Sequence, residues 1–65
     1  MIMNFNDQKG FRCGDLVKDR LDRYGVVLDI RKYERRGVSE ITVYMVALGY
    51  KMTFWADALH KAQQR

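Results

Sequence analysis

The clearest pattern in the chain is an alternation of hydrophobic and polar residues between Ser39 and Leu48. The positions on one side are all apolar: Ile41, Val43, Met45 and Ala47. Glu40 and Thr42 fall between them, whereas the second half of the segment is apolar on both sides. Because successive side chains of a strand point to opposite faces of a sheet, this pattern predicts a strand over residues 39–48.

Shorter segments on either side are also typical of strands, since they are rich in β-branched or aromatic residues and bounded by glycine or charge. Together they predict about five antiparallel strands, near residues 15–18, 25–32, 39–48, 50–55 and 59–62. In the second of these, Val26, Leu28 and Ile30 alternate, but Val27 is apolar on the other side. Either both faces of that strand are partly covered or a bulge shifts its register.

These strands predict an all-β domain over residues 14–65, preceded by an irregular leader over residues 1–13. The expected core is formed by apolar residues of the strands: Leu16, Val27, Ile30, Ile41, Val43, Met45 and Leu59. Gly25 and Gly49 stand where a strand begins or reverses, so we expect a positive φ at both. The tail from residue 56 fits either a short helical turn or a 3₁₀ turn followed by a last strand.

Composition limits the size and the chemistry of the protein. The chain has 65 residues, 48% hydrophobic and 31% charged, which is typical of one small globular domain. Its only cysteine, Cys13, has no partner for an internal disulfide, which favours a reducing compartment. The longest apolar run, residues 43–48, is far shorter than the ~20 residues that span a bilayer. We therefore expect a cytoplasmic protein, or one that becomes ordered in a virion, with no membrane partner.

Residues that could carry catalysis are few. Cys13 and His60 are the only cysteine and histidine, and no spacing ties them into a nucleophile–base pair. One cysteine and one histidine do not complete a tetrahedral metal site, and the chain has neither a calcium-binding loop nor a Gly-rich phosphate loop. The sequence therefore predicts a binding module and not an enzyme, with no catalytic residue, cofactor, metal or small-molecule substrate.

Short motifs in the first two predicted strands are typical of a known group of folds. The first strand carries Gly14-Asp15-x-Val17 and the second Gly25-Val26-Val27-x-x-Ile30. A charged loop, a long strand, a glycine hairpin, an aromatic strand and a turn ending in Leu59 follow. Over residues 14–62 this order resembles the small SH3-like barrels of KOW and Tudor type, and is similar to hemimethylated-DNA-binding (HspQ-type) proteins and to short phage-encoded proteins. The resemblance implies a five-stranded SH3-like barrel with an irregular leader and a short C-terminal turn or helix.

Positive charge is concentrated in the middle of the chain. Residues 18–36 contain seven bases and four acids, and so carry +3 of the net charge of +4. Tyrosines interleaved with bases suit contacts to backbone phosphates and stacking of nucleobases. The candidate nucleic-acid-binding residues are Arg20, Arg23, Tyr24, Arg31, Lys32, Tyr33, Arg35 and Arg36. The alternative is that these charges only solvate the loops and protect the strand edges.

A second candidate surface is aliphatic and aromatic. The residues predicted to face outward there are Tyr44, Val46, Leu48, Tyr50 and Trp55. Either the leader covers them through Phe5 and Phe11, or they form a protein interface. In the second case the chain is an interaction or assembly subunit, such as a viral structural or decoration protein, and can form a homo-oligomer. The sequence thus leaves two classes of partner open, nucleic acid and a protein of a larger assembly.

Overall fold

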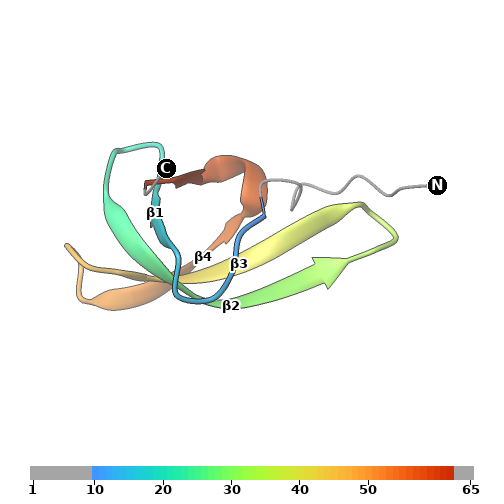
Figure 1. The fold of residues 1–65 in the computed structure, drawn as a ribbon, viewed down its shortest axis with the longest axis horizontal. Helices are drawn as coiled ribbons and strands as arrows, with labels where there is room; N and C mark the ends of the chain where they lie inside the picture. The colour runs from blue at the N-terminus through green and yellow to red at the C-terminus, as the bar shows by residue number, and fades with distance from the viewer. Residues whose placement is uncertain (1–9, 63–65) are drawn as a thin grey trace.

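The structure, a computed structural model, describes residues 10–62 and builds them into one antiparallel sheet (Figure 1). Within these residues the strands are β1 (Leu16–Lys18), β2 (Tyr24–Tyr33), β3 (Val38–Met45), β4 (Tyr50–Trp55) and β5 (His60–Lys61). Their order across the sheet is β4-β3-β2-β1-β5. A 3₁₀ turn, η2 (Ala56–Ala58), connects β4 to β5. The prediction of an all-β chain is confirmed. Two forms were predicted for the tail, and the structure has the second of them, a 3₁₀ turn followed by a last strand.

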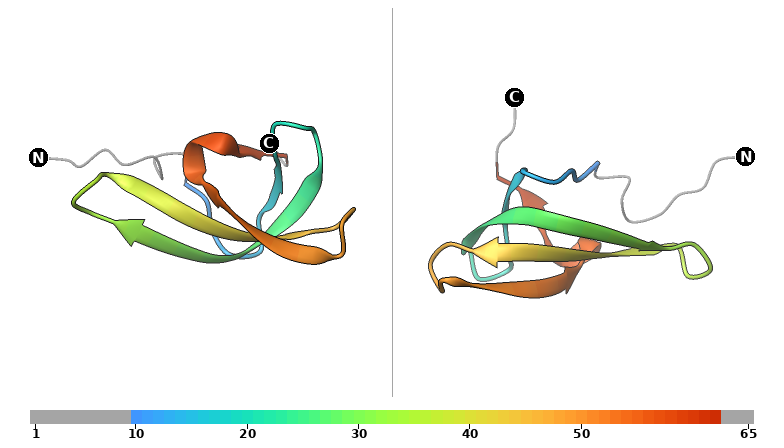
Figure 2. Two further views of the ribbon diagram at one scale, coloured as in Figure 1. Left: turned by 180° about the vertical axis from the view of Figure 1, so that it is seen from behind. Right: turned by 90° about the horizontal axis from the view of Figure 1, so that it is seen from below.

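Strands β2 and β3 form a long hairpin (Figure 1), and Figure 2 shows from two further sides that its end projects past the other strands. The register advances by two residues on β3, from Val43 to Ile41, while it advances by three on β2, from Val27 to Ile30. The extra residue is Leu28, which lies in a β-bulge and is exposed. This bulge explains why the apolar residues of β2 fail to alternate, because it turns both Val27 and Ile30 toward the core.

The core lies on the inner face of the sheet, beneath η2 and the segment that precedes β1. Its buried hydrophobic residues are Phe11, Val17, Val27, Ile41, Val43, Met45, Ala56 and Leu59. Two predicted core residues are only half-buried, Leu16 and Ile30. Leu16 pairs with Val26 on the outer face, so the next residue, Val17, is the one that enters the core. Phe11 anchors the leader in the core, whereas Phe5 lies outside the described residues.

Two expectations about turns and glycines are corrected. Strand β3 ends at Met45 rather than at residue 48, because residues 46–49 form a turn in which the amides of Leu48 and Gly49 donate to the Met45 carbonyl. Gly49 has the expected positive φ of 79°, which suits this turn. Gly25 does not, since it lies within β2 in extended conformation. Its requirement for glycine has a different origin, the close approach of β3.

The described residues contain no helix with the length and apolar character of a membrane span.

Candidate nucleic-acid interface

The far end of the β2–β3 hairpin is a basic arm, defined here as residues 31–38. Its turn is closed by the amides of Arg36 and Gly37, which donate to the Tyr33 carbonyl at 3.0 and 2.9 Å, and Gly37 has a φ of 68°. Four cations project from the arm against the single acid Glu34, which gives residues 31–36 a formal charge of +3. These cations are Arg31, Lys32, Arg35 and Arg36, and all four are exposed. With Tyr33, the hairpin therefore gathers five of the eight candidate nucleic-acid-binding residues at one end.

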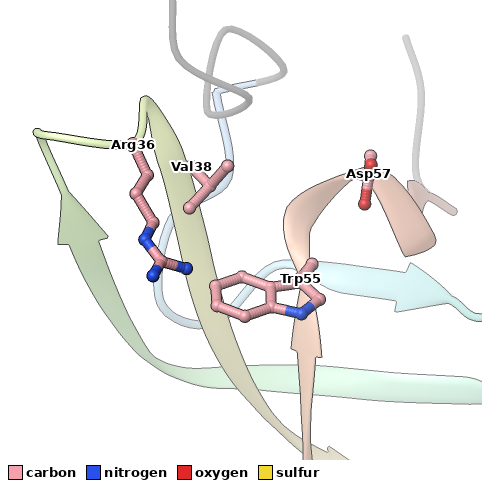
Figure 3. A pocket seen from close by; sticks show the side chains of 4 residues that line it. All are labelled: Arg36, Val38, Trp55 and Asp57. Atoms are coloured by element: carbon pink, nitrogen blue, oxygen red, sulfur yellow. The ribbon is translucent and has the colours of Figure 1, made fainter.

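At the base of the arm, an open hollow of about 320 Å³ lies beside the only tryptophan of the chain. It is lined by Arg36 and Val38 from the arm, by Trp55 at the end of β4, and by Asp57 of η2 (Figure 3). The Arg36 side chain extends from the arm toward the indole ring, and Asp57 stands on the opposite side of the hollow (Figure 3). Trp55 is 49% exposed, so its ring is open to a ligand that enters this space.

Neighbouring side chains hold the Trp55 ring in place. The Tyr33 ring meets it edge-on, with centroids 6.1 Å apart and planes at 65°. The Tyr33 hydroxyl in turn donates to Glu40 Oε1 at 2.6 Å. Arg31 pairs with Glu40 in the β2–β3 register. Tyr33 foremost, and then the carboxylates of Glu40 and Asp29, raise the pKa of Arg31. The Arg31 guanidinium, which is charged at any physiological pH, offsets the negative charge of Glu40 beside Trp55.

The remaining basic candidates lie at the other end of β2, in and next to the loop of residues 19–23. Arg23 forms a salt bridge with the buried carboxylate of Asp19, with Nη2 2.8 Å from Oδ2. Its positive charge is therefore already paired with an acid within the fold. The Lys18 ammonium lies over the Tyr24 ring, with Nζ 5.2 Å from the ring centroid. Arg20 reaches the Asp57 carbonyl at 3.5 Å. Arg23 and Tyr24 thus lie at the opposite end of β2 from the arm, whereas Arg20 contacts Asp57, which lines the hollow at the base of the arm.

The residues of the predicted aromatic surface do not share one face. Tyr44 and Trp55 lie on the outer face of the β3–β4 hairpin, whereas Tyr50 pairs with Met45 on the inner face. Val46 and Leu48 belong to the turn, where Val46 is exposed and Leu48 packs against the core. The sequence prediction assigned these residues to one face by assuming that a single strand continues to Leu48. Strand β3 ends at Met45, so the alternation does not extend to Val46 and Leu48.

Val38, Glu40 and Asp57 line or support the hollow and were not among the predicted site residues. No local signal marks them, because the hairpin and η2 bring them together from separate parts of the chain. Comparison of the chain with protein-family models, curated proteins and solved structures found no match. Residues 10–62 contain no cluster of three or more His, Cys, Asp or Glu side chains that could hold a metal ion.

Proposed function

We propose that this chain is a non-enzymatic binding module of the small SH3-like barrel type that contacts nucleic acid, or a complex containing it, through the basic arm and Trp55. The five antiparallel strands and the 3₁₀ turn before the last of them support the barrel type, as the sequence resemblance implies. Under this proposal the protein acts where nucleic acid is accessible, in the cytoplasm or in a virion.

One observation carries the proposal: the exposed Trp55 ring stands beside Arg36, at the base of an arm of charge +3. A nucleotide presents a flat base and an anionic phosphate, and proteins bind this combination with an aromatic ring and an adjacent cation. Exposed charges alone are enough to keep a loop soluble, so solubility does not explain the exposed Trp55 ring beside Arg36. The Tyr33–Glu40 hydrogen bond and the Tyr33–Trp55 contact hold the ring ready for stacking.

Removing the two guanidinium groups of the turn tests this function. We expect the double variant Arg35→Ala/Arg36→Ala to bind labelled single-stranded DNA more weakly and to lower the magnitude of the slope of log K against log salt by about 1.4, because two phosphates are no longer neutralised. Its folding stability should change by less than about 1 kcal/mol, because both side chains are exposed. Anisotropy titrations at several salt concentrations measure the slope, and thermal unfolding measures the stability.

The matched control is Arg12→Ala/Lys61→Ala, which removes the same charge from residues next to β1 and in β5. If only the overall charge attracts DNA, the two double variants will weaken binding equally, and the arm is then not an interface. Trp55→Ala should weaken binding by about 1–3 kcal/mol because a base no longer stacks on the indole, and Trp55→Phe by less. Absence of binding by the unaltered protein at low salt contradicts the proposed function.

A protein interface is the second candidate, and the observation that favours it is the group of exposed side chains at the end of the sheet opposite the arm. Tyr24, Tyr44 and Val46 are 47%, 41% and 57% exposed and lie close together, since the Val46 amide donates to the Tyr24 carbonyl. An interface of this kind predicts association that persists at high salt. Sedimentation of wild type and Tyr44→Ala would then differ, while Arg35→Ala/Arg36→Ala would sediment as wild type does.

A further inference from the structure

The outer face of the β3–β4 hairpin carries two aromatic rings, only one of which belongs to the hollow at the base of the arm. The register pairs Trp55 with Glu40, Thr53 with Thr42, and Lys51 with Tyr44. These six side chains share one face, because paired residues of antiparallel strands point to the same side and alternate positions return to it. Trp55 and Tyr44 therefore stand at opposite ends of a strip that is about 13 Å long.

The surface between the two rings is open. Trp55 borders a second hollow of about 400 Å³, lined by Glu40, Thr53, Phe54, Trp55 and Ala58. Three residues of the strip line this hollow, Glu40, Thr53 and Trp55, and it also extends to Phe54 and to Ala58 of η2. The residues of the strip that lie between the two rings, Thr42 and Thr53, have short side chains, and Tyr44 at the far end is 41% exposed.

Each ring has a cation beside it. Arg36 lines the hollow at Trp55, and Lys51 is the cross-strand partner of Tyr44 and is exposed. Glu40 is the only acid of the strip. Its carboxylate accepts a hydrogen bond from the Tyr33 hydroxyl, and Glu40 is the cross-strand partner of Arg31. Both neighbours reduce the repulsion between the Glu40 carboxylate and a bound phosphate. An aromatic ring with a cation beside it thus occurs at both ends of the strip, as Trp55 with Arg36 and as Tyr44 with Lys51. Each of these pairs is suited to bind one nucleotide.

We infer that the outer face of the β3–β4 hairpin, from Trp55 across Thr53 and Thr42 to Tyr44, is a track for single-stranded nucleic acid, with Lys51 as a phosphate contact at its far end. The inference rests on the proposed function and names its ligand. A duplex cannot use the track in this way, because its bases stack on one another and are not presented to side chains. An unpaired strand can place separate bases on the two rings while its backbone passes the threonines.

The test measures Kd by anisotropy for three labelled probes: an oligo-dT of about 15 nucleotides, a duplex of that length, and an abasic oligomer of the same charge. Tyr44→Ala is expected to weaken oligo-dT binding about tenfold, while Tyr44→Phe keeps the ring and the affinity. The matched control is Tyr50→Ala, since Tyr50 is a comparably exposed tyrosine on the opposite face of the same hairpin. Its Kd should equal that of wild type, and the abasic oligomer should not distinguish Tyr44→Ala from wild type.

Equal reductions in affinity from Tyr44→Ala and Tyr50→Ala, or a duplex bound as tightly as oligo-dT, would overturn the track. If the arm variant Arg35→Ala/Arg36→Ala weakens binding and Tyr44→Ala does not, the proposed function stands and the track fails. If no probe binds at low salt, the proposed function fails and the track fails with it. A changed sedimentation coefficient for Tyr44→Ala, with an unchanged Kd for oligo-dT, also rejects the track and assigns Tyr44 to a protein interface.

Discussion

Replacing Gly25 with alanine is expected to destabilise the protein by about 3 kcal/mol, the upper range of the cost of overpacking a core. Gly25 lies in β2 between β1 and β3, paired with Val17 on one side and Met45 on the other. A Cβ at this position would collide with the Val43 side chain and lie 2.9 Å from the Tyr44 carbonyl oxygen. The Tyr44 oxygen belongs to the backbone, so β3 itself must move to make room.

Thermal unfolding of the Gly25→Ala variant measures this effect, and we expect its Tm to fall by roughly 15 °C for a domain of this size. Gly49→Ala is the control, because its Cβ would meet nothing within 4 Å and only the φ of 79° would be strained. That strain should cost about 1 kcal/mol. A Gly25→Ala protein that is as stable as Gly49→Ala would show that β3 does not approach β2 so closely.

Gly25 also shows how far the sequence could predict the fold. Strand periods and glycine positions were enough to predict the five strands, because local alternation sets which residues can form a half-buried strand. The reason for Gly25 was predicted wrongly, since positive φ and close packing both select glycine and only the neighbouring strand distinguishes them. The bulge at Leu28 was one of two open alternatives, and the pairing of β2 with β3 decided between them.

The candidate site was predictable only where it is local in sequence. The charged connection of residues 32–37 is evident from its composition, and the hairpin does bring its cations together. The neighbourhood of Arg36 and Trp55 was not predictable, because it depends on how η2 and the end of β4 fold against the arm. Arg23 was predicted to face a ligand, but its partner Asp19 is a buried acid in a loop that the sequence pattern describes only as charged.

Asp19 is the subject of the second large effect, and Asp19→Ala is expected to cost about 3 kcal/mol of folding stability. Its side chain is 3% exposed and closes the loop between β1 and β2. Oδ1 accepts the amides of Leu21 and Arg23, each at 2.9 Å, and Oδ2 accepts Arg23 Nε at 2.8 Å. Alanine would leave both amides and the guanidinium without this partner, in a loop that also holds Asp22 at a φ of 63°.

The same hydrogen bonds make this contribution depend on pH. Burial alone would raise the pKa of Asp19, but the hydrogen bonds from Arg23 and Leu21 and the charge of Arg23 outweigh burial and lower the pKa below its ordinary value. A carboxylate with a lower pKa in the folded state than in the unfolded state stabilises the fold fully above the unfolded pKa of about 4. This stabilisation is lost as the pH falls through the folded pKa, where the carboxylate takes up a proton.

Urea unfolding at a series of pH values should therefore show a difference in stability between wild type and Asp19→Asn that is constant near neutral pH and shrinks below about pH 4. Asparagine keeps the shape and one acceptor oxygen, so the variant separates the charge of Asp19 from its role in the turn. Asp22→Asn is the matched control, because that side chain is 86% exposed and asparagine tolerates the same positive φ. A difference for Asp19→Asn that stays constant down to pH 2 would show that the loop depends on the shape of this side chain and not on its charge.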